Sequence, residues 1–164
     1  MIRVLLVDDH AVVRTGFRLL LQARPDIAVA GEAESGEAAC QRYIELAPDA
    51  VIMDIAMPGM GGIEALRRIR AHDPQARVLA LSAHDDPMHA RRALREGALG
   101  FLSKRSAPEA LLEAVAAVAG GQRYIELSPD VVIMDIAMPG MGGIEALRRI
   151  RAHDPRARVL ALSA

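Results

Sequence analysis

The sequence has few cysteines and aromatic residues: one cysteine, two tyrosines, two phenylalanines and no tryptophan among 164 residues. The single cysteine, Cys40, excludes a disulfide within the chain and is typical of a reducing compartment. No apolar run approaches the roughly 20 residues that a membrane-spanning helix requires. The chain opens Met1-Ile2-Arg3-Val4 without the pattern of a signal peptide. We therefore expect a soluble, cytoplasmic protein with no membrane segment.

The sequence also lacks an excess of charge and has almost no lysine. Its 20 basic residues balance 21 acidic ones, which argues against a strongly basic nucleic-acid binder. The 52% hydrophobic content excludes a disordered chain. Lys104 is the single lysine, and the other basic residues are arginines. Either one lysine has persisted by chance, or position 104 needs a compact ammonium group in place of a guanidinium.

A long internal repeat divides the chain. Residues 41–83 recur as residues 122–164, with three differences: Ala47/Ser128, Ala50/Val131 and Gln75/Arg156. So close a match indicates a recent segmental duplication or an artefact of the gene model, and two copies do not make a solenoid. We expect one domain over residues 1–121, followed by a partial repeat over residues 122–164 that reads strand, helix, strand.

Apolar runs and helical patterns alternate along the first 121 residues. The expected strands are Ile2–Val7, Ile27–Ala30, Ala50–Met53, Arg77–Leu81 and Leu99–Leu102, and each is followed by a helical segment. Strict alternation of this kind predicts an α/β fold, in which helices cover both faces of a parallel sheet.

Polar side chains follow four of these strands. Asp8 and Asp9 come after the first strand, Asp54 after the third, Ser82 after the fourth and Lys104 after the fifth. Parallel strands bring such residues to one edge of the sheet, where ligands bind in open α/β folds. Carboxylates packed this closely repel one another. A bound Mg²⁺ relieves that repulsion, because it favours oxygen ligands and keeps several waters. Asp8 taken alone could instead cap the helix that follows it.

This set of residues suits phosphoryl transfer. A carboxylate beside Mg²⁺ is a competent oxygen nucleophile toward phosphorus, and Asp54 is the best candidate because it lies centrally. Asp9, with Asp8, would hold the metal. Lys104 would hold the carboxylate or its acyl phosphate, and Ser82 could donate a hydrogen bond to a phosphoryl oxygen.

The residues that follow these strands resemble those of a known family, the receiver domain of bacterial two-component response regulators. The resemblance covers residues 1–121 and rests on four motifs in the right order: Val7-Asp8-Asp9-His10, Val51 to Met60, Leu81-Ser82-Ala83 and Gly97 to Lys104. Residues 116–124 are most similar to the branch in which a LuxR/FixJ-type helix-turn-helix follows the receiver. The resemblance implies a flavodoxin-like, doubly wound, five-stranded parallel sheet of order 2-1-3-4-5, here with an extra strand-helix-strand segment.

The resemblance also implies roles for particular residues. Asp54 would accept a phosphoryl group from a sensor histidine kinase. Mg²⁺ would bind Asp9, Asp54 and the backbone carbonyl of Ala56, with Asp8 acting through water. Ser82 and Phe101 would be the coupled switch positions, although spacing alone favours Phe101 as a core aromatic.

Partners follow from the same resemblance. The face over residues 87–119 is the usual dimer surface of the family, so we expect a homodimer. Relatives control transcription, but residues 122–164 re-enter the receiver sequence and encode no recognition helix, so DNA binding would need an output domain that this chain lacks. The alternative is a truncated or domain-swapped receiver that serves as a protein-interaction or phosphate-sink module.

The repeat carries a second acceptor candidate, Asp135, at the position of Asp54. Residues 122–164 could extend the receiver sheet, replace residues 41–83 in the same chain or in a partner, or be poorly ordered. Replacement would place Asp135 beside Asp8, Asp9 and Lys104. Otherwise Asp135 has no acid pair or lysine of its own and should be inert. We favour the first copy in the receiver, because shorter loops close at lower entropic cost.

Two enzyme classes fit less well. Phosphatases of the haloacid-dehalogenase type need a second acid two residues after the nucleophile, where this chain has Ala56. Dinucleotide-binding oxidoreductases need Gly-x-Gly-x-x-Gly after the first strand, and the only similar stretch, Gly59 to Gly62, follows the third. We therefore expect a receiver that is phosphorylated and dephosphorylated on itself and is not a turnover enzyme.

Overall fold

The computed structural model describes residues 1–83, 87–126, 132–135, 137, 142–153 and 157–162. The chain divides into two compact units, unit 1 over Met1–Leu127 and unit 2 over Ser128–Ala164. No helix among the described residues combines the length and the apolar character needed to span a membrane.

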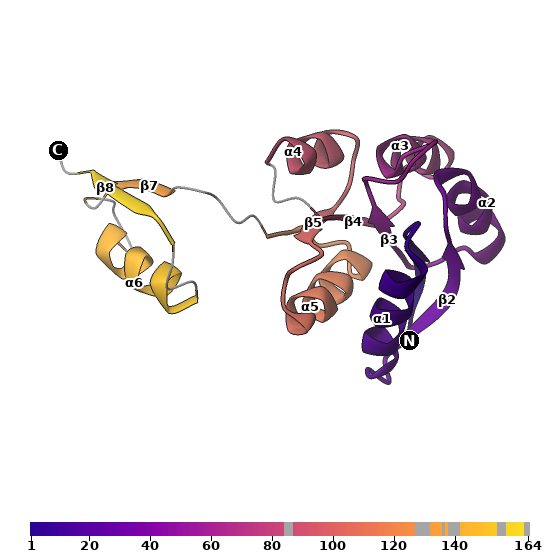
Figure 1. Cartoon of the computed structure of the whole chain (residues 1–164), viewed down its shortest axis with the longest axis horizontal. Helices are drawn as coiled ribbons and strands as arrows, with labels where there is room; N and C mark the ends of the chain where they lie inside the picture. Colours follow the sequence, from indigo (N-terminus) through magenta and orange to yellow (C-terminus); the bar gives the residue numbers. More distant parts are fainter. Residues whose placement is uncertain (84–86, 127–131, 136, 138–141, 154–156, 163–164) are drawn as a thin grey trace. The chain divides into compact units, whose positions relative to one another are not determined.

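Unit 1 is built on a parallel sheet of six strands in the order β2-β1-β3-β4-β5-β6 (Figure 1). The strands are β1 (Ile2–Val7), β2 (Ile27–Ala33), β3 (Ala50–Asp54), β4 (Val78–Ser82), β5 (Gly100–Ser103) and β6 (Tyr124–Ile125). The helices between them are α1 (Ala11–Gln22), α2 (Gly36–Leu46), α3 (Gly62–His72), α4 (Pro87–Arg95) and α5 (Pro108–Ala119). The predicted doubly wound α/β fold is confirmed.

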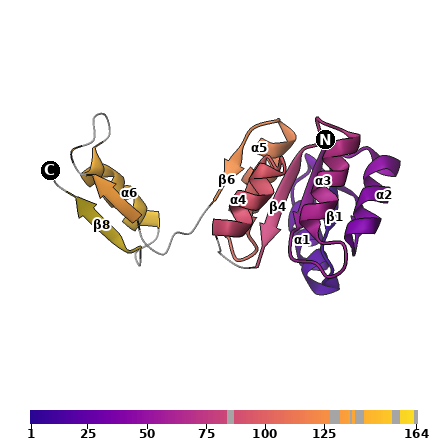
Figure 2. The ribbon, with the colours of Figure 1, turned by 90° about the horizontal axis from the view of Figure 1, so that it is seen from above.

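Alternate residues of the buried strands point to opposite faces of the sheet, and each face has its own core. On one face, Val51, Met53 and Phe101 pack with residues of α2, α3 and α4. On the other face, Ile52 and Leu79 pack with residues of α1 and α5. Figure 1 shows α2, α3 and α4 on one side of the strands and α1 and α5 on the other, and Figure 2 looks onto the side of α3 and α4. The sheet is therefore covered on both faces, and its carboxyl edge remains for function.

The expected order 2-1-3-4-5 is present, and the short strand β6 extends it. Tyr124 and Ile125 pair with Gly100 and Phe101 of β5, and the amide of Glu126 also donates to Phe101 O. These pairings place the end of unit 1 at Leu127, beyond the expected domain boundary at residue 121. Three arrangements were considered for residues 122–164, and among the described residues of this range only β6 extends the receiver sheet.

Unit 2 reproduces a part of unit 1. Its elements β7 (Val132–Asp135), α6 (Gly143–His153) and β8 (Val159–Leu162) form a two-stranded parallel sheet with one helix. Each element corresponds to β3, α3 or β4 with the numbering raised by 81, and the register Val132↔Val159 repeats Val51↔Val78. The two copies therefore fold alike, and in this structure the first copy lies within the six-stranded sheet.

Candidate functional site

The carboxyl edge of the sheet brings two buried carboxylates together. Asp8 directly follows β1 and Asp54 ends β3, which is the neighbour of β1 in the sheet. Their side chains are only 1% and 2% exposed. The amide of His10 donates to Asp8 Oδ1 at 2.8 Å, and the amide of Ala56 donates to Asp54 Oδ1 at 2.9 Å. One oxygen of each carboxylate is thus fixed by the backbone, and the other faces the site.

Lys104 bridges these two carboxylates. It follows β5, and its Nζ lies 2.5 Å from Asp8 Oδ2 and 2.7 Å from Asp54 Oδ2. Burial lowers the pKa of Lys104, but hydrogen bonds and charge attraction from Asp54 and Asp8 outweigh burial and raise the pKa above its ordinary value. The ammonium therefore stays charged through the neutral range. A compact cation that serves two carboxylates at once accounts for the single lysine in an arginine-rich chain.

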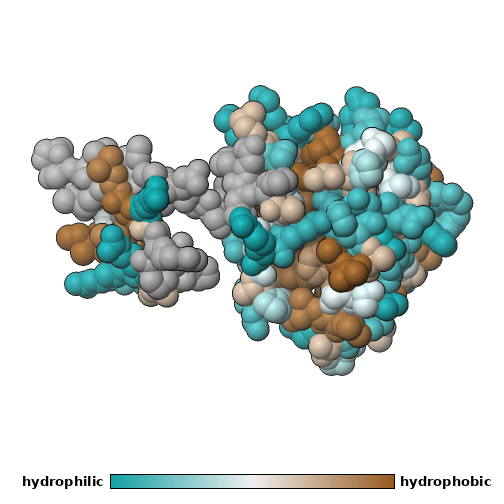
Figure 3. Space-filling view, in the orientation of Figure 1, coloured by the Kyte–Doolittle hydropathy of each residue, from teal (hydrophilic) through white to brown (hydrophobic). Residues whose placement is uncertain are grey.

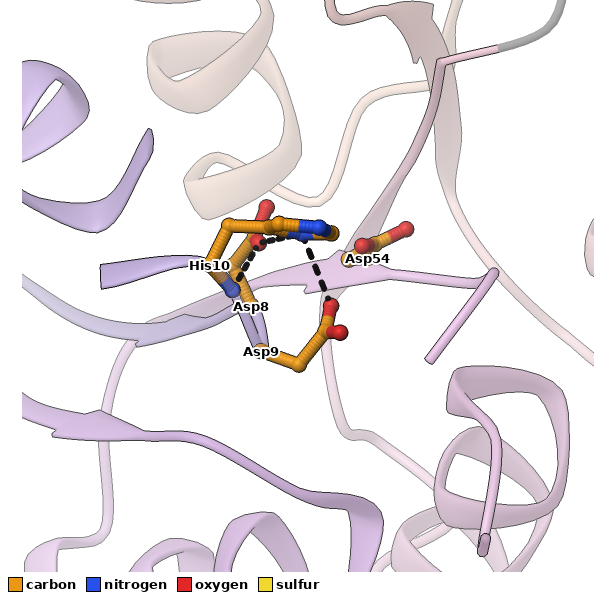
Figure 4. Close-up of side chains that lie close together, drawn as sticks. All are labelled: Asp8, Asp9, His10 and Asp54. Atoms are coloured by element: carbon orange, nitrogen blue, oxygen red, sulfur yellow. Dashed lines mark hydrogen bonds and ion pairs between the residues drawn. The ribbon is translucent and has the colours of Figure 1, made fainter. Parts of the chain in front are cut away.

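Asp9 and His10 complete the cluster (Figure 4). Nδ1 of His10 lies 3.1 Å from Asp9 Oδ1 and 3.3 Å from Asp8 Oδ1. The side chain of His10 is 66% exposed, so it closes the cluster on the solvent side. In the sequence, His10 stands out only as part of the motif Val7-Asp8-Asp9-His10. Its position directly after the acid pair was the available signal.

This cluster fits a divalent cation. Asp8, Asp9, His10 and Asp54 each offer a ligand atom, and these atoms all lie within 4.8 Å of one another. Asp9 Oδ1 and Asp8 Oδ2 are buried and accept no hydrogen bond of good geometry, although His10 and Lys104 lie within ion-pair distance. Three carboxylates beside one ammonium also leave an excess of negative charge. Oxygen-rich, partly satisfied groups of this kind suit Mg²⁺, which binds through a few carboxylates and waters.

The other expected site residues lie around the cluster. Ser82 ends β4 and is fully buried, and its backbone oxygen accepts from the amide of Lys104 at 2.8 Å. Ala56 is exposed in the loop after β3, so its backbone is accessible beside Asp54. Phe101 lies in β5, 2% exposed, within the core on the side of α4. The structure therefore places Ser82 and Ala56 at the carboxyl edge and Phe101 in the core beneath α4.

Gly62, the first residue of α3, packs directly against the backbone of Asp54. A Cβ atom at Gly62 would lie 2.0 Å from the backbone oxygen of Asp54, whereas one at Gly61 would lie no nearer than 3.4 Å to any atom. Only a residue without a side chain allows α3 to approach β3 this closely. Sequence reasoning did not identify this role, because a pair of glycines does not show which one is crowded.

The second acceptor candidate has a different setting. Asp135 ends β7, as Asp54 ends β3, and β7 pairs only with β8 among the described residues. The side chain of Asp135 lies outside the described part of the structure. Within unit 2 no counterparts of Asp8, Asp9 and Lys104 occur in the sequence.

Comparison with known proteins agrees with this geometry. The family described as response regulator receiver domain matches residues 4–116 and again residues 118–164. Response regulator GacA of Pseudomonas viridiflava is 40% identical over 131 residues, which are 80% of this chain and 60% of that protein. Response regulator UvrY of Escherichia coli K12 is 42% identical over 125 residues, 76% of this chain and 57% of that protein. The chain thus spans about three fifths of the length of these relatives.

Solved structures show the same similarity. A LuxR-family response regulator from Aurantimonas sp. SI85-9A1 matches with a TM-score of 0.74 and 43% identity, covering 79% of this chain and 91% of that one. The signal receiver domain of NarL from Mycobacterium tuberculosis matches with a TM-score of 0.71 and 37% identity, covering 74% and 98%. A structure of RcsB dimers bound to DNA matches with a TM-score of 0.70 and 28% identity, covering 76% and 64%.

Proposed function

Because this chain belongs to the receiver domain family of response regulators, we propose that it is a phosphorylation switch in which Asp54 accepts a phosphoryl group from a sensor histidine kinase. The observation that carries this proposal is the bridge from Lys104 to Asp8 and Asp54. It holds the acceptor carboxylate, the acid pair and the single ammonium at one point of the sheet edge.

The transfer is a displacement at phosphorus. A carboxylate oxygen of Asp54 attacks the phosphorus atom, and the bond between phosphorus and the donor's imidazole nitrogen breaks. The electron pair of that bond stays on the nitrogen, and the product is an acyl phosphate on Asp54. Lys104 already lies against Asp54, so it neutralises charge on the transferred oxygens without moving far. Ser82, at the end of the next strand, donates to a phosphoryl oxygen in this proposal.

Asp9 and Asp54 would hold Mg²⁺, together with the backbone carbonyl of Ala56, and Asp8 would act through water. When bound, the ion supplies positive charge that offsets the repulsion between the carboxylates and the incoming phosphoryl group. The buried oxygen of Asp9, which accepts no hydrogen bond, supports this assignment.

The acyl phosphate is a signal and not a step of turnover. Water attack at phosphorus releases phosphate and restores the Asp54 carboxylate. No second acid stands two residues later, since that position is Ala56. That position therefore offers no general base, which argues against enzymatic turnover.

The output side of the switch lies over residues 87–119. Ser82 and Phe101 belong to adjacent strands, with Ala80 opposite Phe101 and Ser82 opposite Ser103. A shift of Ser82 toward the phosphoryl group would alter packing around Phe101 and so the surface of α4, β5 and α5, which we propose as the homodimer face. Dimers are described for the similar protein RcsB. This is a bistable element biased by a local change of charge.

The repeat provides a matched test of the acceptor. The full chain is incubated with acetyl phosphate and Mg²⁺, and the monomer is analysed by intact mass. We expect the mass of one phosphoryl group per chain, its loss in Asp54→Asn, and no effect of Asp135→Asn. The two substitutions fall in the same sequence context, Val-Ile-Met-Asp-Ile-Ala-Met-Pro. Uptake that survives Asp54→Asn and disappears with Asp135→Asn would contradict the proposal.

A further inference from the structure

Unit 2 has the internal structure of a piece of a receiver without the neighbours of that piece. In unit 1, β3 lies between β1 and β4, and β4 lies between β3 and β5. In unit 2, β7 and β8 pair only with each other among the described residues, so both outer edges of their sheet are unpaired. Open strand edges and uncovered apolar faces favour association with matching chain segments.

Equivalent side chains in the two copies show how much burial unit 2 lacks. Leu79 of β4 is fully buried, whereas the same residue of the repeat, Leu160 of β8, is 54% exposed. Ile144 of α6 is 58% exposed, whereas its counterpart Ile63 packs against the core. Figure 3 shows hydrophobic surface on the described part of this unit. The sequence is the same in both places, so the difference comes from the elements that flank β3 and β4 in unit 1.

Unit 1 therefore shows which surface is complementary to unit 2. We propose that residues 131–162 of one chain take the place of residues 50–81, which hold β3, α3 and most of β4, in a second copy of this chain. Since Asp135 ends β7 as Asp54 ends β3, the exchange brings Asp135 of one chain to Asp8, Asp9 and Lys104 of the other. The site of the exchanged dimer is then built from two chains, and its phosphoryl acceptor is Asp135.

The three differences between the copies permit this exchange. Ala47 and Gln75 are exposed in unit 1, so Ser128 and Arg156 are tolerated there. Ala50 is buried, and the larger Val131 at this position crowds the core, which favours the first copy. The exchanged form is therefore a minor one, close in energy to the form described above.

A second copy is favoured over exchange within one chain. Glu126 is bonded to Phe101, and the five residues between Glu126 and Val132 reach about 20 Å when extended. In the register of the sheet, Glu126 lies level with Asp54, so Val132 reaches the place of Val51 only by crossing three strand spacings and returning three residues along the strand, about 17 Å in a straight line through the sheet. That line is blocked by β4 and β5. A path around them must also clear the layer of covering helices, which is about 10 Å thick, so it exceeds the available length. Exchange within one chain thus requires β6 to detach.

The exchange must take place during folding. The strand β3 is paired on both sides, so its release opens the whole sheet. During refolding at high protein concentration, either the chain's own copy or the copy from another chain can occupy the place of β3, α3 and β4. The exchanged dimer then persists because unfolding is slow. Domain swapping of this kind exchanges identical elements at little cost in contacts.

Complementation between two inactive chains tests the proposal. One chain carries Asp54→Asn and Asp135→Asn, so that it keeps Asp8, Asp9 and Lys104 but has no acceptor. The other carries Asp9→Asn and Asp54→Asn, so that Asp135 is its acceptor and its own site is impaired. The chains are refolded from guanidinium separately and together, separated by size, and treated with acetyl phosphate and Mg²⁺.

We expect a phosphoryl group on the second chain in the dimer refolded from the mixture, and none in chains refolded separately. A matched control adds Leu160→Asp to the second chain. Unit 2 tolerates this change at an exposed position, but insertion would bury the new carboxylate at the place of Leu79, so both dimer and label should be lost. Label in Asp54→Asn monomers would overturn the proposal in favour of exchange within one chain.

The readouts separate this inference from the proposed function on which its chemistry rests. If acetyl phosphate phosphorylates the wild-type monomer but not the dimer refolded from the two variant chains, the exchange is overturned and the proposed function stands. Unlabelled wild-type monomer overturns the proposed function, and the exchange is then decided by size alone. Absence of a refolded dimer contradicts the exchange, and a dimer that Leu160→Asp abolishes supports it.

Discussion

Removal of the bridging ammonium should destabilise the protein and make it depend more strongly on Mg²⁺. In Lys104→Ala, the carboxylates of Asp8 and Asp54 remain 1% and 2% exposed but lose a cation that lay 2.5 and 2.7 Å away. Breaking a buried ion pair by removing one partner costs about 3–5 kcal/mol. Lys104 itself is 12% exposed. Solvent screening therefore favours the lower end of that range, about 3 kcal/mol.

The size of this effect can be measured by thermal unfolding. For a domain of this size, about 3 kcal/mol corresponds to a fall in Tm on the order of 10 °C. The measurement is made by circular dichroism in EDTA and again with excess Mg²⁺. A divalent cation neutralises the same carboxylates, so the rise in Tm on adding Mg²⁺ should be larger in Lys104→Ala than in the wild type.

The control is a cation that lies in solvent. Arg24 forms an ion pair with Asp26 at 2.8 Å, but the two side chains are 45% and 49% exposed. Arg24→Ala should therefore leave the Tm nearly unchanged, because exposed ion pairs contribute little. If Lys104→Ala unfolded at the temperature of Arg24→Ala, or gained no more from Mg²⁺ than the wild type, the account of the bridge would be refuted.

Two further predictions concern the frame around the site. Gly62→Ala should lower the free energy of unfolding by about 1–3 kcal/mol or more, because the new methyl group overlaps the backbone oxygen of Asp54. Urea unfolding measures this loss, with Gly61→Ala as the matched control. Equal stability of the two variants would refute the prediction. Tyr43→Phe should cost about 1–2 kcal/mol near neutral pH, because the Tyr43 hydroxyl donates to Asp73 at 2.6 Å. That hydrogen bond lowers the pKa of Asp73, so its contribution is present above the ordinary value of 3.8 and is lost as the pH falls through the lowered pKa. Chemical unfolding of both proteins between neutral and strongly acidic pH should show the deficit shrinking, and a constant deficit would contradict this reasoning.

The sheet and the central site could be predicted from the sequence because their signals are local. Each buried strand is a short apolar run, and the polar residue that ends it lies at the carboxyl edge whatever the detailed packing. Asp8, Asp54 and Lys104 meet for that reason. The close approach at Gly62 and the contact of His10 with the acid pair depend on how two backbone segments cross, which periodicity does not report.

The strand β6 shows a stronger limit of sequence reasoning. The hexapeptide Gln-Arg-Tyr-Ile-Glu-Leu occurs twice, and Tyr43-Ile44 is helical in α2, whereas Tyr124-Ile125 is extended in β6. The first copy continues a helix that Ser35 caps by accepting from the amide of Ala38. The second copy follows Gly121, whose φ of 77° ends α5 and turns the chain toward the open edge of β5. Local propensity is the same in both, so the surroundings decide the structure.

In the monomer, Asp54 and not its duplicate Asp135 should receive the phosphoryl group. Monomer labelled with acetyl phosphate and Mg²⁺ is reduced with borohydride, which converts an aspartyl phosphate to homoserine, and is then digested with trypsin. The peptides 43–67 and 124–148 differ in mass, because two of the three substitutions between the copies fall within them. We expect homoserine at position 54 in the first peptide. Homoserine at position 135 in the monomer, or at neither position, would contradict it.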